Sequence, residues 1–163
     1  MSQKSTMQRI VGTVNMLPNP LRQKTLSLLL GKLVPYVGTS SLIIEEMTEA
    51  RVVTIVRNQK HVRNHIGQVH AVAMALAVET ATGFVTAMNL PEDKLPLIKS
   101  MKVDYKKRTK GDMRAVATLT ADQREKILTE DRGNVEVEVH VTDETGEEPI
   151  QCTAIWAWVP KKK

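Results

Sequence analysis

One carboxylate stands alone in the longest apolar stretch of this sequence. Glu79 is the only acidic residue between Val69 and Met88, where the other side chains are mostly those of Ala, Val, Met and Thr. Burying an ionised carboxylate without a partner costs several kcal/mol, so the group must be paired, hydrogen-bonded or protonated. Two interpretations follow. Glu79 is either a structural residue satisfied by backbone or by a neighbouring Arg, or a carboxylate held in a cleft as a base or nucleophile.

The loop before this stretch supplies further polar groups. Residues 58–69 include Asn58, Gln59, His61, Asn64, His65, Gly67 and Gln68. Free backbone N–H groups at a helix start, with the positive end of the helix dipole, suit a carbonyl oxygen that becomes negative in a transition state. His61, His65 and His70 suggest a metal site, but no Cys or carboxylate shares the loop, so the sequence favours none.

Spacing restricts how these residues can cooperate. His70 and Glu79 are nine residues apart, which is about 900° of helix, so they point to opposite sides. They cannot form a dyad within one helix, and groups that work with Glu79 must come from the preceding loop or from a second subunit. Gly83 lies one turn after Glu79 on the same face. Its missing side chain leaves room either for a ligand or for a closely packed strand.

The elements that position these residues form an α+β pattern. Residues 69–88 are apolar on nearly every side, which predicts a helix surrounded by protein. Apolar or alternating runs predict strands at 42–46, 51–57, 101–107, 113–119, 135–141 and 150–159. We expect hairpins across the turns at 110–112 and 143–146. The sequence therefore predicts one long central helix wrapped by a mostly antiparallel sheet.

The excess positive charge is confined to the first quarter of the chain. The net charge is +5, and residues 1–44 contain no acidic residue, whereas basic and acidic residues balance afterwards. A helix is predicted from Leu21 to Val34, too short to span a bilayer. A targeting peptide, a membrane-surface helix and a plain basic helix all fit this charge. We favour a plain helix that packs on the main body as a lid or flank.

Composition limits the class of protein. A length of 163 residues suits a single domain, with residues 1–36 as a basic helical extension. The only cysteine, Cys152, excludes an internal disulfide and is typical of a reducing compartment, so we expect a cytoplasmic protein without a transmembrane segment. One Phe, two Tyr and two Trp offer few stacking platforms, so nucleic acid is not expected as a partner.

The segment N-H-I-G-Q-V-H-A at residues 64–71, followed by Glu79, resembles the active-site motif of hotdog-fold thioesterases of the phenylacetyl-CoA type. In that family an Asn, a His-Gly-Gly helix start and an acid nine positions after the His form the site. The resemblance covers most of the chain after the first helix and implies the hotdog fold. It implies that Asn64 orients the water or thioester, that His70 begins the helix, and that Glu79 is the base or nucleophile.

The remaining roles also follow from this resemblance. The family's oxyanion donor, a backbone N–H, falls on Ala71, where Ala-Val replaces Gly-Gly and narrows the approach, as in a His-Ala/Glu subgroup of hotdog proteins. Ser100 is the nearest match to a Ser or Thr helper on the facing strand. Gly67 and Gly83 would line the substrate site. Basic residues at its rim would hold the phosphates of coenzyme A or form a plain solvated face, namely Lys106, Lys107, Arg108 and Lys110.

Two classes of function stay open. The preferred one is hydrolysis of acyl-CoA thioesters without a cofactor, in which the Ala71 N–H polarises the carbonyl and Glu79 activates water or attacks. The alternative is a non-catalytic dimer that binds acyl-CoA or lipid in the same tunnel. In such families the site combines residues of two subunits, so a homodimer or a dimer of dimers is expected.

Overall fold

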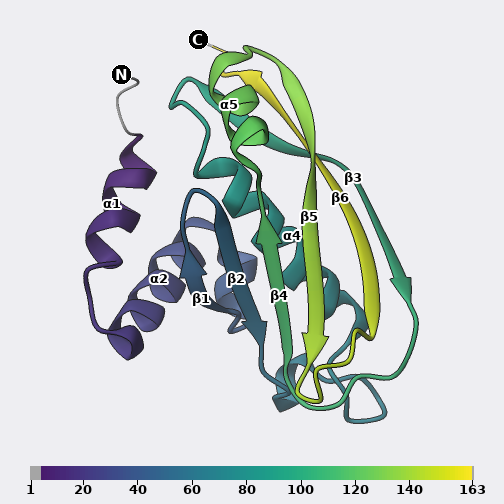
Figure 1. Ribbon diagram of the computed structural model, residues 1–163. Coiled ribbons are helices and arrows are strands. Elements are labelled where there is room, and N and C mark those ends of the chain that lie inside the picture. The colour runs from purple at the N-terminus through teal and green to yellow at the C-terminus, as the bar shows by residue number, and fades with distance from the viewer. Residues whose placement is uncertain (1–4, 163) are drawn as a thin grey trace.

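A long helix forms the centre of the computed structural model, which describes residues 5–162 (Figure 1). Helix α4 spans Ala71–Ala87, and 11 of its 17 residues are buried. It begins directly after His70, which caps it, so the central helix predicted over residues 69–88 is confirmed. Its many small side chains allow the sheet to approach closely. The hydroxyl of Thr54 in the sheet donates to the Ala77 carbonyl of the helix at 2.9 Å.

Six antiparallel strands form one sheet that packs around α4. The strands are β1 Ile43–Met47, β2 Arg51–Val56, β3 Lys94–Tyr105, β4 Met113–Thr118, β5 Gly133–Asp143 and β6 Ile150–Pro160. Their order in the sheet is β1-β2-β4-β5-β6-β3. Strand β5 changes partner along its length, because residues 138–143 pair with β4 and residues 133–137 pair with β6. The predicted antiparallel sheet around a central helix is therefore present.

Strand β3 differs from its predicted form. It begins at Lys94, well before the predicted start at 101, and a bulge within it breaks the period-two alternation that would have revealed it. Among the described residues it pairs with β6 alone. The predicted hairpin across residues 110–112 is therefore wrong, because this segment leads from the edge of the sheet to β4. The hairpin across residues 143–146, between β5 and β6, is confirmed.

Three helices, instead of the one predicted over residues 21–34, form the N-terminal part. They are α1 Thr6–Val14, α2 Asn19–Leu33 and α3 Pro35–Thr39. Leu26 and Leu30 of α2 and Val37 of α3 are buried, so these helices pack on the body beside β1 (Figure 1). Of the predicted basic extension over residues 1–36, residues 1–4 lie outside the described part.

Two helices that the sequence analysis did not predict share the same start signal. Before α1, the Ser5 hydroxyl accepts the Gln8 N–H while the Gln8 side chain accepts the Ser5 N–H. Helix α5, Ala121–Thr129, begins with the same reciprocal pair between Thr120 and Gln123. Each capping box satisfies two backbone donors that would otherwise be unpaired.

Strand β6 buries the side that its alternation predicts, including Ala154, Trp156 and Trp158. Cys152 on the same strand is half-buried, and burial raises the pKa of its thiol to about 11, which keeps it protonated and unreactive. Across residues 5–162, no helix combines the length and the apolar character needed to cross a membrane.

Candidate active site

Glu79 lines a cavity of about 570 Å³ beside α4. Burial raises the pKa of its carboxyl group, and a weak 3.5 Å hydrogen bond from the Thr80 hydroxyl opposes this shift. Within residues 5–162, no Lys, Arg or His nitrogen lies within 4 Å of the carboxylate. The interpretation in which an Arg neutralises Glu79 therefore has no support in the described part of the chain.

The walls of this cavity are mostly apolar. They include Met7, Leu33, Val37, Phe84, Leu95 and Trp156, which come from the N-terminal helices, from α4 and from the sheet. Lys94 also borders the space, but its Nζ donates to the Glu130 carbonyl at 2.6 Å. Two carboxylates border the space, the half-buried Glu79 and the exposed Glu92. A largely apolar space with a carboxylate on its wall suits a ligand that has an apolar tail and one reactive polar group.

Gly83 makes room for a tryptophan. A Cβ atom at this position would lie 2.7 Å from Cζ2 of Trp156, closer than real side chains approach one another. The indole is held in place, because its Nε1 donates to the Thr82 hydroxyl at 2.9 Å. The sequence left two explanations open for this glycine, and the contacts support close packing of a strand. Gly83 also borders the cavity beside Glu79, as their spacing predicts.

The N-terminus of α4 presents a backbone donor without an acceptor. His70 is exposed and caps the helix, with its ring Nδ1 accepting the Val72 N–H at 3.1 Å. None of the hydrogen bonds within the described part of the chain uses the Ala71 N–H. An N–H at the positive end of a helix is well suited to a developing oxyanion. The geometry thus gives His70 an orienting role at the helix start.

Strand β3 ends beside the same helix start. The Tyr105 hydroxyl donates to the Ala71 carbonyl at 2.9 Å, so residues 106–112 begin at this end of α4. Four basic side chains of that loop are exposed, namely Lys106, Lys107, Arg108 and Lys110. One of them, Lys107, forms an ion pair with Glu147. The predicted basic rim therefore lies at the end of the helix that carries the free N–H.

Asn64 helps to build the loop before α4. Its side-chain Oδ1 accepts the N–H groups of Ile66 and Gln68 at 3.1 and 3.0 Å. Gly67 is exposed and has a φ of 78°, a left-handed conformation that glycine adopts without strain. Both residues therefore shape the turn. The described hydrogen bonds leave the Asn64 Nδ2 group available to a ligand.

Ser100 lies apart from the cavity in its own chain. It is exposed on the edge strand β3, directly after the bulge and opposite Ile155 of β6. The residues of β3 that border the cavity are Lys94, Leu95 and Pro96. The predicted helper residue is therefore not brought to Glu79 within one chain.

Glu79 and the Ala71 N–H are also separated along the helix. Their positions are eight residues apart, which is about 12 Å of helix axis. A reacting carbonyl must lie about 3 Å from both its activating groups. One chain by itself therefore does not bring these two groups to one thioester.

Comparisons with known proteins identify the family of this chain and confirm its fold. The family model described as domain of unknown function DUF4442 matches residues 22–159. The chain belongs to this family. No curated protein matches the sequence at a significant level.

Three solved structures have the same fold as this DUF4442 protein. A protein of unknown function from Pseudomonas aeruginosa, described as a probable thioesterase, has a TM-score of 0.76 and 23% identity, covering 89% of this chain and 97% of its own. A thioesterase family protein from Silicibacter pomeroyi has a TM-score of 0.64 and 15% identity, covering 80% of this chain and 93% of its own. A thioesterase from Haemophilus influenzae has a TM-score of 0.62 and 13% identity, covering 80% of this chain and 88% of its own. The hotdog fold predicted from the motif is confirmed.

Sequence reasoning missed several contributors to the site. Thr80 is adjacent to Glu79 and could have been found, because a hydroxyl next to a lone carboxylate is a ready hydrogen-bond donor. Three other contributors reach the site through contacts between distant parts of the chain, namely Tyr105, Trp156 and Leu33. No local sequence pattern predicts such contacts. In the described part of the chain, no three His, Cys, Asp or Glu side chains gather as metal ligands would.

Proposed function

We propose that this protein hydrolyses acyl thioesters, with acyl-CoA as the substrate class. The main observation in support is the position of the Glu79 carboxylate on the wall of a largely apolar cavity of about 570 Å³. Burial raises the pKa of this carboxyl group, and it has no cation partner in residues 5–162. A carboxylate kept basic in this way is suited to remove a proton from water. Solved structures of the same fold that are named thioesterases support the same reaction class.

In the proposed reaction, an Ala71 N–H donates to the thioester carbonyl oxygen, which becomes negative as the carbonyl carbon is attacked. As a general base, Glu79 takes a proton from the attacking water; the carbon–sulfur bond then breaks, and this proton passes to the leaving sulfur. As a nucleophile, Glu79 attacks the carbonyl carbon and expels the thiolate; water then hydrolyses the acyl–Glu79 anhydride and supplies the proton that the thiolate takes up. Both routes give a free acid and a free thiol.

The basic loop over residues 106–112 would receive the coenzyme A part of the substrate. The hydrogen bond from Tyr105 to the Ala71 carbonyl brings this loop to the end of α4 where the thioester would bind. Lys106 and Arg108 are exposed, and neither has a carboxylate within 4 Å among residues 5–162. Such cations can contact phosphates from the rim of a site.

The proposed site requires two copies of the chain. Glu79 and the Ala71 N–H lie about 12 Å apart along one helix, so a partner must supply one of them. The edge strand β3 offers a surface for pairing, because its 12 residues expose apolar side chains at Leu95, Leu97, Ile98 and Met101. A long apolar edge is a template for pairing with another strand. We therefore propose a homodimer or a dimer of dimers.

The substitution Glu79→Gln tests the proposal directly. The amide keeps the volume and much of the hydrogen bonding but cannot accept the proton, so hydrolysis of acyl-CoA should fall by about a hundredfold or more. The melting temperature should hold or rise, because an uncompensated, half-buried charge becomes neutral. Release of free thiol and thermal unfolding are measured on one preparation, across short, aromatic and long acyl-CoAs.

A matched control is Glu136→Gln, which makes the same chemical change on the exposed side of β5 and should leave turnover unchanged. An unchanged rate in Glu79→Gln would reject the catalytic role and favour the alternative, a dimer that binds acyl-CoA or lipid without turnover. A clear loss of stability would instead identify Glu79 as the partner of a buried cation.

A further inference from the structure

Helix α2 carries leucines on both of its sides. Leu26 and Leu30 are buried against the body of the protein, whereas Leu21 and Leu28 are 51% and 57% exposed. A helix that only covers a core presents polar residues on its outer side. The outer leucines of α2 therefore have no counterpart within the described part of the chain.

The exposed leucines alternate with cations along one stripe, which consists of Leu21, Lys24, Leu28 and Lys32. Intervals of three and four residues place all of them on the same face of the helix. Apolar exposure continues past both helix ends, since Met16 is 84% and Tyr36 59% exposed. A stripe of this kind fits a membrane interface, because leucine can enter the apolar boundary while a neighbouring lysine extends its ammonium group to the headgroups.

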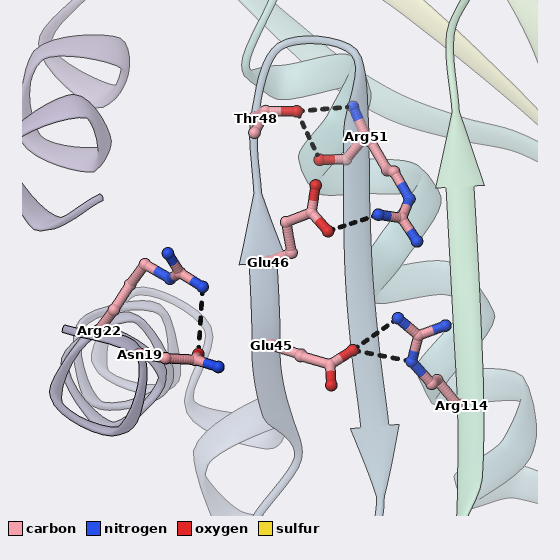
Figure 2. A network of polar contacts seen from close by, with 7 residues as sticks. All are labelled: Asn19, Arg22, Glu45, Glu46, Thr48, Arg51 and Arg114. Atoms are coloured by element: carbon pink, nitrogen blue, oxygen red, sulfur yellow. Dashed lines mark hydrogen bonds and ion pairs between the residues drawn. The ribbon is translucent and has the colours of Figure 1, made fainter. Parts of the chain in front are cut away.

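The charges around this stripe remain positive. The nearest acids along the chain, Glu45 and Glu46, are already held by arginines of the sheet (Figure 2). Arg114 Nη2 lies 2.7 Å from Glu45, and Arg51 Nη1 lies 2.6 Å from Glu46. Within residues 5–162, neither Lys24 nor Lys32 has a carboxylate within 4 Å.

We propose that the outer stripe of α2 docks the protein on an anionic lipid surface. Leucine side chains enter the apolar boundary of the bilayer, while the lysine stems extend their ammonium groups to the headgroup phosphates. A second copy is a poorer occupant, because a two-fold axis through the stripe would bring lysines against lysines with no acid between them. Charge complementarity therefore favours anionic lipid.

The stripe also lies next to the cavity. Leu33, at the end of α2, is 60% exposed and yet lines the space that contains Glu79. A docked protein would therefore hold one wall of its cavity close to the lipid surface. This inference concerns binding and does not depend on hydrolysis, so it can fail or succeed independently of the proposed function.

Sedimentation with lipid vesicles tests the inference. The full chain should bind phosphatidylcholine vesicles that contain about 30% phosphatidylglycerol and should not bind pure phosphatidylcholine. Lys24→Glu together with Lys32→Glu should weaken binding by on the order of tenfold or more, since each basic residue near the surface contributes about 1 kcal/mol. Arg57→Glu with Arg132→Glu, also exposed, makes the same change in net charge outside the stripe and should retain most binding.

An apolar pair separates the remaining outcomes. Leu21→Gln with Leu28→Gln should also release the protein from anionic vesicles while the melting temperature and the oligomeric mass stay unchanged, because both side chains are exposed. If the stripe pair and the control pair of charge reversals weaken vesicle binding equally, net charge alone explains the binding, and the proposal is overturned. Absence of vesicle binding would overturn the proposal. A change of oligomeric mass in the leucine pair would also overturn it and would indicate that the stripe is a contact between protein copies.

Discussion

At Glu79 two requirements oppose each other. Burial beside an apolar cavity makes the charged carboxylate costly, yet a base must be ionised to accept a proton. The raised pKa is the result of this conflict, because desolvation exceeds the help given by the Thr80 hydroxyl. The same residue should therefore link the stability of the protein to pH. Its contribution to stability should fall as pH rises, whereas that of a surface glutamate that accepts hydrogen bonds should rise.

We expect the stability difference between Glu79→Gln and the wild type to grow with pH. Burial raises the pKa of folded Glu79 above its ordinary value of 4.5, so its contribution to stability is lost as pH rises from 4.5 through the raised pKa. The two melting temperatures should be similar below this window, and the variant should be the more stable above it. Thermal unfolding across the acid-to-neutral range measures the difference.

Glu92→Gln is the control of opposite sign. A hydrogen bond from the Thr6 side chain, and another from its N–H, lower the pKa of exposed Glu92, so its contribution is present above 4.5 and lost in acid. This variant should be the less stable one at neutral pH. A pH-independent difference for Glu79→Gln would show that its carboxylate is not penalised by burial.

The sequence was most informative where one residue type conflicted with its surroundings. Glu79 could be found because a charge among apolar residues needs an explanation. The roles expected of Asn64 and Ser100 were harder to locate, since the first shapes its own turn and the second faces solvent in one chain. Contacts between distant segments, such as that of Tyr105 with Ala71, depend on strand order, which local sequence does not encode.

At the scale of elements, a long apolar run was sufficient to predict α4 and strict alternation was sufficient for β5, but such patterns failed where neighbouring elements decide the outcome. The bulge and exposed edge position of β3 removed its alternation, and its partner is the last strand rather than the next. Helices α1 and α5 carry capping boxes that could have been recognised. The closeness of α4 to β6 could not, because it depends on which strand crosses at Gly83.

This crossing gives a prediction of stability. Gly83→Ala should destabilise the protein by about 1–3 kcal/mol, because the new Cβ would lie 2.7 Å from the Trp156 ring, whose Nε1 is anchored to Thr82. Gly12→Ala in α1 is the matched control. No atom lies within 4 Å of its added Cβ, so better helix propensity should stabilise the protein by up to about 1 kcal/mol. Urea unfolding of both variants measures these changes, and a neutral Gly83→Ala would contradict the packing explanation.

At the scale of the whole molecule, the two edges of the sheet differ. Strand β1 is flanked by α2, whereas β3 is an edge strand of 12 residues that exposes Leu95, Leu97, Ile98 and Met101. Pairing through β3 would remove this liability. It would also bring a second α4 within reach, which the separation of Glu79 from the Ala71 N–H demands if both act on one thioester. Assembly and chemistry thus lead to the same expectation, a site shared between chains.

A single substitution can remove the proposed oxyanion donor without disturbing the helix. Ala71 is the first residue of α4, a position where proline is favoured, and its N–H has no acceptor among the described residues. His70 has φ and ψ of −64° and 143°, an extended conformation compatible with a following proline. Ala71→Pro should therefore fold normally while turnover falls by about a hundredfold to a thousandfold.

Mixing the two inactive variants tests the shared site. If Glu79 of one chain works with the Ala71 N–H of the other, a dimer of Glu79→Gln and Ala71→Pro chains contains one intact site and one doubly defective site. Random exchange by refolding a one-to-one mixture should then restore about one quarter of wild-type turnover, because half the dimers are mixed and each has one working site. Mixing folded variants without exchange is the control. A refolded mixture no more active than the average of its components would show that each site is built within a single chain.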